Sequence, residues 1–205
     1  MTEPMNLADF LTSSETAFRH ALGSAGFRES NAGTWIRQTG DELNVVSIQM
    51  HSSEPLFCVN LGVHYSFLPK AGTEAPLNGP EIDHPDCEIK LRLTSDPAAK
   101  DQWWPLTNSS ISEIEKLLSS RGLAIFDDYR LSGLISSMDA KSIESGNPGL
   151  LSGLTKVRAC LLLSRMHEKL GSRDKCIDAA NLGIKLAGMA VGPKKALKDI
   201  LKRCG

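Results

Sequence analysis

The sequence predicts an α+β fold, in which an antiparallel sheet of about four to five strands packs with helices and is followed by an all-helical C-terminal segment. Two observations support this fold class. Residues 44–50 and 56–65 alternate apolar and polar side chains, as half-buried strands do, and a short polar link joins them. After residue 149, apolar side chains recur at helical spacing instead.

The first elements are predicted from periodicity and from turn-forming residues. Residues 6–24 place apolar side chains at helical spacing, and Gly23 marks the end of this helix. Turn-rich residues 27–33 lead into a short strand over residues 34–38. The connector 39–41 then leads into the two alternating strands, so we expect an antiparallel meander.

A long loop is expected after the meander. Residues 68–85 contain four prolines, and proline lacks the N–H group that a strand ladder needs. Loops of this length are typically functional or mobile. Alternation returns in residues 87–93, which predicts a fourth strand with Lys90 and Arg92 on its polar side.

Helices are predicted for most of the remaining chain. Ser110 and Glu113 form a capping-box pattern, which predicts the start of a helix that ends at Gly122. A weaker helical pattern covers residues 127–138. Residues 145–149 have the sequence Ser-Gly-Asn-Pro-Gly, which is typical of a linker.

The linker predicts an α+β domain over residues 1–145 and a helical subdomain of about three helices over residues 150–205. Within the second part, residues 154–170 and 175–188 have the pattern of a helical hairpin, and Pro193 can open a third helix. The hairpin weakly resembles a tetratricopeptide unit, at Leu163, Ser164, Gly171, Cys176, Ile177 and Ala180. An ordinary helical hairpin that covers the N-terminal domain is the favoured alternative.

Composition places the chain among ordinary globular proteins. Of its 205 residues, 41% are hydrophobic and 23% are charged. Residues 1–10 lack a basic segment followed by an apolar run, and no segment is apolar over the length of a membrane span. The five cysteines are widely spread and form no CxxC pair, which favours a reducing compartment and burial as small apolar residues. We therefore expect a cytoplasmic protein without a membrane partner.

The net charge of −1 conceals an asymmetry along the chain. From residue 146 onward there are 12 basic and 4 acidic residues, against 11 basic and 20 acidic residues before it. The two parts therefore carry about −9 and +8. Such a difference favours mutual docking or simple solvation of the parts, with separate external partners as the alternative.

Several short segments occur in a distinctive order, namely Gly26–Phe27, Trp35–Arg37, Asn44–Gln49, Phe57–Gly62, Cys87–Arg92 and Trp103–Pro105. Their order and spacing resemble the bacterial family labelled domain of unknown function 4304. The resemblance extends over about residues 17–126, a little over half of the chain. It implies a compact α+β domain and brings no established activity.

The polar side of the two alternating strands is the first candidate binding surface. Ser47 and Gln49 come near Asn60 and His64 if the strands pair as neighbours, because cross-strand partners lie within side-chain reach. Neutral groups of this kind suit a peptide, a nucleotide or another polar ligand. The alternative is that this face lies under a helix, where its polar groups satisfy each other.

Two adjacent tryptophans and one arginine extend the candidate surface. Trp103 and Trp104 point to opposite sides of an extended segment, so one can fill the core while the other serves as an interface anchor. Arg92 suits an anion, although a solvated strand charge needs no ligand. The candidate binding residues are Gln49, Asn60, His64, Arg92, Trp103 and Trp104.

No catalytic residue, metal site or cofactor is predicted. His64, His84, Asp86 and Cys87 contain suitable atoms, but their spacing matches neither a histidine pair on a helix nor a CxxC clamp. The glycines of the strands and loops also do not precede a helix as a phosphate-binding loop does.

These observations favour a non-catalytic intracellular protein-binding module. The acidic N-terminal part suits a basic partner, and an immunity or inhibitor protein that neutralises a bacterial toxin is the preferred form of this hypothesis. The first alternative is a small-molecule or nucleotide-acting enzyme that uses Gln49, Asn60, His64 and Arg92. The second is nucleic-acid binding through the basic C-terminal helix, which has no aromatic residue to stack on bases.

Overall fold

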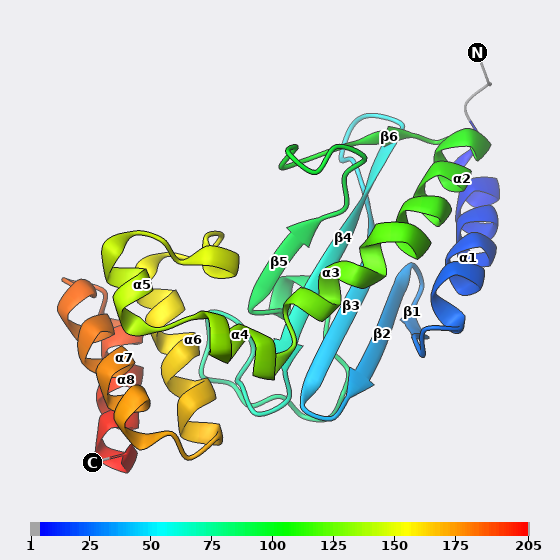
Figure 1. Cartoon of the computed structure of the whole chain (residues 1–205). Coiled ribbons are helices and arrows are strands. Elements are labelled where there is room, and N and C mark those ends of the chain that lie inside the picture. The colour runs from blue at the N-terminus through cyan, green and yellow to red at the C-terminus, as the bar shows by residue number, and fades with distance from the viewer. Residues whose placement is uncertain (1–4, 205) are drawn as a thin grey trace. The chain divides into compact units, whose positions relative to one another are not determined.

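The computed structural model describes residues 5–204 and divides the chain into two compact units, the first ending at Asp127 and the second beginning at Asp128 (Figure 1). The first unit combines a sheet with helices, and the second contains helices, which confirms the predicted fold class. The unit boundary precedes the predicted linker at residues 145–149. The expectation that residues 1–10 do not form a leader concerns in part residues 1–4, which lie outside the described residues.

Antiparallel pairing joins all the strands of the first unit. They are β1 (Arg28–Asn31), β2 (Thr34–Thr39), β3 (Glu42–Met50), β4 (Leu56–Tyr65), β5 (Ile89–Arg92) and β6 (Trp104–Pro105). The first five pair in chain order, and β6 pairs with the start of β4. β1 lies in residues that the sequence predicted to be a turn, because a tight turn at Gly33 folds this segment back on β2.

Helices cover one face of this sheet (Figure 1). They are α1 (Leu7–Gly23), α2 (Asn108–Leu117), the single π turn η2 (Leu118–Gly122) and α3 (Leu123–Asp128). Phe10 of α1 contacts Phe57 of β4, with 4.5 Å between ring centroids, and Phe18 stacks on Trp35 of β2. Burial of these aromatic side chains favours the docking of α1 on the sheet.

The start and the end of α2 differ from the prediction. Thr107 is the N-cap, since its extended backbone lets its hydroxyl accept a hydrogen bond from the Ser110 N–H group at 3.2 Å. The predicted cap at Ser110 is therefore wrong, and this hydroxyl is buried in the first turn. Gly122 also does not end the helix, because η2 continues directly into α3.

The long loop between β4 and β5 folds over the other face of the sheet. Its residues Leu77, Ile82 and Cys87 join an apolar cluster with side chains of β2 and β3, listed as Ile36, Leu43 and Val45. Lys70 pairs with Asp86 at 2.6 Å, and the Ala71 N–H group donates to the Asp86 carbonyl. The predicted loop is thus ordered by its own packing, with a short 3-10 turn, η1 (His84–Asp86), at its end.

The second unit contains α4 (Leu131–Ser137), α5 (Ala140–Ser145), the 3-10 turn η3 (Gly149–Leu151), α6 (Lys156–Lys169), α7 (Arg173–Leu186) and α8 (Val191–Cys204). The predicted linker, residues 145–149, runs from the last residue of α5 to the first residue of η3, so it lies inside this unit. α6 and α7 form the expected hairpin, and α8 packs on both. The likeness to a tetratricopeptide unit stays a prediction. Among the described residues, no helix has the length and apolar character of a membrane span.

We predict that Gly62→Ala loosens the long loop of the first unit. A Cβ atom at this strand position would lie 2.6 Å from the Cys87 sulfur and 3.3 Å from the Val45 Cβ, closer than packed atoms tolerate. We expect the free energy of unfolding to fall by about 1–3 kcal/mol, measured by urea denaturation. In a double-mutant cycle, Cys87→Ala removes the closest atom and should recover part of this loss. Additive losses would contradict the proposed collision.

Gly183→Ala should destabilise the second unit. Its added Cβ would lie 2.7 Å from a Leu197 methyl group and 2.9 Å from the Cys160 Cβ, between α8 and α6. We expect a loss of about 1–3 kcal/mol in thermal or urea unfolding. Gly133→Ala in α4 is the matched control, because nothing lies within 4 Å of its added Cβ. That helical change should stabilise by up to about 1 kcal/mol, and equal effects would refute the packing argument.

Candidate functional site

The polar side chains of β4 lie on the sheet face opposite to α1, α2 and α3. This arrangement follows from strand alternation, since Phe57 points toward α1 while Cys58, Asn60 and His64 point the other way. The alternative to a binding surface was that this face lies under a helix. Among the described residues, no α-helix of the first unit covers it. Two other segments cover different parts of it, namely the loop of residues 66–88, which includes η1, and the connection between β5 and β6.

His64 lies under the first of these segments. It is opposite Leu43 in the β3–β4 ladder and is completely buried. Its Nδ1 atom accepts a hydrogen bond from the Glu88 N–H group at 3.2 Å, which anchors the end of the loop to β4. His64 is thus separated by the strand register from Gln49, and it has a structural environment rather than a surface one.

The other predicted polar residues come together farther along the strands. Ser47 is opposite Asn60, and Asn60 is in turn opposite Arg92 on β5. The Asn60 amide donates to Gln49 Oε1 at 3.2 Å and approaches Ser47 Oγ at 3.5 Å. Asn60 is only 5% exposed whereas Gln49 is exposed, so the pair connects the interior of the sheet to its surface.

Arg92 contacts three residues next to the Asn60–Gln49 pair. Its Nε atom pairs with Asp101 Oδ1 at 3.0 Å, and its Nη1 atom contacts the buried sulfur of Cys58. The guanidinium carbon lies 5.2 Å from the ring centroid of Trp103, a cation–π arrangement. The Arg92 side chain is 20% exposed, so it forms the floor of the surface and Trp103 lies above it.

Trp103 is held from three directions. Besides the Arg92 guanidinium, its indole N–H group donates to Asp101 Oδ2 at 3.2 Å, and its ring meets the edge of His51 at 4.9 Å between centroids. His51 is itself fixed, since its Nδ1 atom accepts hydrogen bonds from the N–H groups of Ser53 and Glu54 in the β3–β4 turn. Trp103 remains half-buried.

Trp104 points the other way, as expected for adjacent residues in an extended segment. It is 3% exposed and packs 6.2 Å from the Phe57 ring, so it belongs to the core under the helices. The structure therefore brings four of the six candidate residues together and leaves His64 and Trp104 elsewhere. The name Trp103 surface is used below for Gln49, His51, Asn60, Arg92, Asp101 and Trp103.

Sequence reasoning missed two members of the Trp103 surface. His51 was assigned to the polar link between strands, and Asp101 was not considered. A signal for Asp101 is present, since it lies two residues before Trp103, where a carboxylate can reach the indole N–H group. His51 has no comparable signal, because its contact depends on how a distant connection returns to the sheet.

The Trp103 surface offers hydrogen-bonding groups, charged groups and an aromatic ring. It offers an aromatic face, a carboxylate and an amide, while its one sulfur nucleophile, Cys58, is fully buried beneath Arg92. Among the described residues, no group of three or more histidine, cysteine, aspartate or glutamate side chains is arranged to hold a metal ion. The surface therefore suits a partner that brings a flat, complementary face.

We predict that acid weakens the loop that covers His64. Burial, assisted by the positive charge of Lys90, lowers the pKa of His84 in η1 from 6.5 to about 4. The unfolded chain binds this proton below pH 6.5 while the folded chain does not until about pH 4. The contribution of neutral His84 to the free energy of unfolding should be fully present above pH 6.5 and should be lost as the pH falls from 6.5 to about 4. Urea denaturation at pH 7 and pH 5 would measure this loss.

His84→Gln removes this titration and should make the loss between pH 7 and pH 5 smaller. His20→Gln, in an exposed histidine of α1 whose Nδ1 atom lies 2.6 Å from Glu115 Oε1, is the comparison variant outside the loop. The explanation fails if His84→Gln retains the full pH dependence of the wild type.

Comparison with known proteins gives one match. The model of a family described as a domain of unknown function, DUF4304, matches residues 18–128, which is more than half of the chain. The matched region contains the whole sheet and the Trp103 surface, while α4 to α8 lie beyond it. No curated protein and no solved structure matches the chain. The chain therefore belongs to the DUF4304 family, as the order of its short segments indicated.

Proposed function

We propose that the first unit is a non-catalytic protein-binding module that docks a basic partner on the Trp103 surface. The observation that carries this proposal is the fixed, half-exposed indole of Trp103. Arg92, Asp101 and His51 hold it before any partner arrives. An anchor that is already ordered loses little conformational entropy on binding, and tryptophan is enriched among the residues that dominate interface energies.

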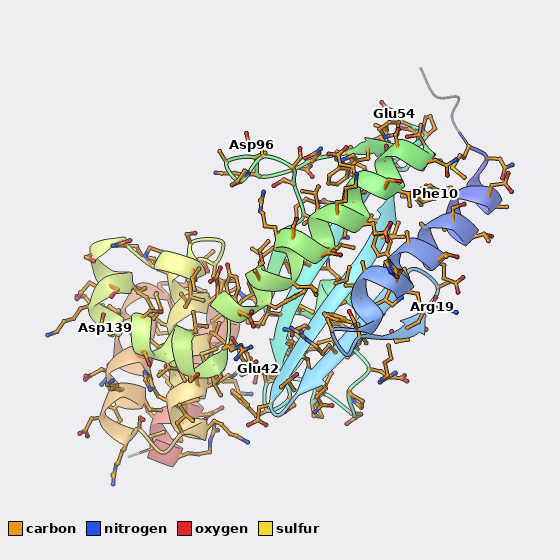
Figure 2. All side chains as sticks on the ribbon, turned by 45° about the vertical axis from the view of Figure 1, so that its right-hand side comes forward. Phe10, Arg19, Glu42, Glu54, Asp96 and Asp139 are labelled. Carbon is orange, nitrogen blue, oxygen red and sulfur yellow. The ribbon has the colours of Figure 1, made fainter. Side chains whose placement is uncertain are left out.

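The charge of the first unit supports a basic partner. Its residues up to Asp127 include 17 acidic and 9 basic side chains, a net charge of −8. Figure 2 shows the exposed Glu54 and Asp96 at the same end of this unit, and Glu42 toward the other end. Glu54 lies in the turn that positions His51, and Asp96 in the connection that carries Trp103. Acidic side chains near an anchor speed association with a basic surface.

A toxin domain with a basic surface is the partner class that we propose, which makes the protein an immunity or inhibitor protein of a bacterial cytoplasm. A nuclease toxin needs positive charge to hold its substrate, so an acidic module can occlude it. The support is the combination of an acidic unit with a preformed aromatic anchor.

The enzyme alternative uses part of the same surface. Gln49, Asn60 and Arg92 do lie together, but Asn60 donates to Gln49 and Arg92 is engaged by Asp101 and Cys58. A substrate would have to displace these partners. In the nucleic-acid alternative, phosphate groups would likewise have to compete with existing partners of α8, since Lys202 pairs with Asp199 and Arg203 pairs with Glu168.

Trp103→Ala in the tagged full chain tests the docking proposal. The wild type, expressed in its native cell, should retain a stoichiometric basic protein under mild salt, to be identified by mass spectrometry. Titration calorimetry with that protein should then show a loss of roughly 30- to 1,000-fold in affinity for Trp103→Ala, because the anchor is removed. The association rate should fall as salt is raised.

Leu11→Ala is the matched control, since Leu11 is an exposed apolar residue of α1 on the other side of the sheet. It should bind as the wild type does. Circular dichroism would verify that both variants fold. The absence of any stoichiometric partner, or equal affinities of the two variants, would contradict the proposal.

A further inference from the structure

Two cysteines that are distant in the sequence meet in the second unit. Cys176 in the first turns of α7 and Cys204 at the end of α8 are 28 residues apart, and their sulfurs are 2.8 Å from each other. Both are free thiols. A disulfide has an S–S length of about 2.0 Å, so a small side-chain movement would suffice to join them. This pair was not predictable from the sequence, because a contact between helices leaves no CxxC spacing.

The two thiols differ in their access to solvent. Cys176 is fully buried, whereas Cys204 is partly exposed. Burial, assisted by the hydrogen bond with Cys204, raises the pKa of the Cys176 thiol to about 12. Thiolates are the nucleophiles in disulfide exchange. Cys204 is therefore the thiol that a reagent in solution can meet first.

A cleft of about 280 Å³ opens beside Cys204. Its lining residues are His167, Glu168, Gly171, Arg173, Arg203 and Cys204. They come from the end of α6, the α6–α7 turn, the start of α7 and the end of α8. The cleft is therefore a built feature of the three-helix packing, with a thiol in its wall. Its volume lies just below the range of about 300–1,000 Å³ that is typical of small-molecule sites, so it suits one end of a small molecule.

The wall of this cleft favours negative charge. Arg173 begins α7, and the N-cap residue Ser172 makes no side-chain hydrogen bond to the first turn of that helix. The positive end of the helix dipole thus adds to the Arg173 guanidinium. Glu168 holds Arg203 by two hydrogen bonds, from Nε at 2.5 Å and from Nη2 at 3.0 Å. Asp174 in the first turn opposes these charges, but the second unit has 14 basic and 7 acidic residues.

We propose that this cleft binds an anionic low-molecular-weight disulfide, which oxidises Cys204 and Cys176 to an intramolecular disulfide. The Cys204 thiolate attacks one sulfur of the bound disulfide, forms a mixed disulfide and releases one small thiolate. Cys176 then attacks the Cys204 sulfur and passes its proton to the second small thiolate, which leaves as a thiol. The two protein thiols lose two electrons in total, and the small disulfide is reduced to two thiols.

The resulting bond would tie the end of α8 to the start of α7. In a reducing compartment the bond would be transient and would report an increase in oxidised small thiols. The other three cysteines, Cys58, Cys87 and Cys160, are all buried, so the exchange is selective for this pair. This inference is independent of the function proposed for the first unit.

Oxidised glutathione, a disulfide that carries several carboxylates, is the probe for the experiment. The reduced full chain, treated with it and mapped by mass spectrometry without reductant, should contain a cross-linked Cys176–Cys204 peptide. Cys176→Ser should accumulate the mixed disulfide on Cys204, because the second attack is missing. Cys204→Ser should form neither product, and Cys160→Ala should behave as the wild type does.

Variants that remove one positive charge test whether the cleft binds the anionic disulfide. Arg173→Gln should slow oxidation by oxidised glutathione roughly three- to tenfold, and should leave the rate with neutral bis(2-hydroxyethyl) disulfide unchanged. Lys195→Gln, in an exposed residue of α8, is the charge-matched control and should change neither rate. Failure to form the Cys176–Cys204 bridge would overturn the proposal. An equal effect of Arg173→Gln on both reagents, or no effect on either, would overturn the role of the cleft.

Discussion

Burial of β4 on both sides is the constraint on which the first unit depends. From Phe57 to Tyr65 every residue of this strand is buried, although the strand contains Asn60 and His64. On one face of the sheet, the aromatic and aliphatic side chains of β4 pack against the helices. On the other side, each polar group needs a partner of its own, because an unsatisfied buried group costs free energy. His64 obtains its partner from the long loop, and Asn60 obtains its partner from Gln49.

This requirement explains why two irregular segments lie on the same face of the sheet. The loop after β4 contributes apolar side chains to one part, where the missing side chain of Gly62 leaves room for Cys87. The connection before β6 covers the other part through Arg92, Asp101 and Trp103. The loop after β4 packs apolar side chains against the sheet, whereas the connection before β6 places polar side chains and the half-exposed Trp103 there. The candidate function is assigned to the connection before β6 because an aromatic side chain held by its neighbours, Trp103, is half-exposed there.

Local patterns were sufficient to predict β2, β3, β4, β5 and the long loop, but they did not predict β1 or β6 as strands. Alternation in β3 and β4 also placed Asn60 and Gln49 on one face, because strand periodicity depends on backbone geometry alone. Contacts between segments distant in the sequence were not predictable in this way. The position of His51 against Trp103, and of Cys176 against Cys204, depends on tertiary packing. The α2 cap was misplaced because Thr107 and Ser110 both have capping side chains and only the backbone conformation distinguishes them.

The edges of the sheet limit how any partner can engage it. β1 and β5, the terminal strands of the five-strand path, have four residues each, and the pairing of β1 with β2 is interrupted by an irregularity between Glu29 and Asn31. β5 also carries Lys90 and Arg92. Short, irregular and charged edges oppose the addition of a foreign strand, and with it edge-to-edge aggregation. A partner of the kind proposed would therefore bind through side chains rather than through a continued backbone ladder, and its specificity would be encoded in a few surface residues that can change without altering the sheet.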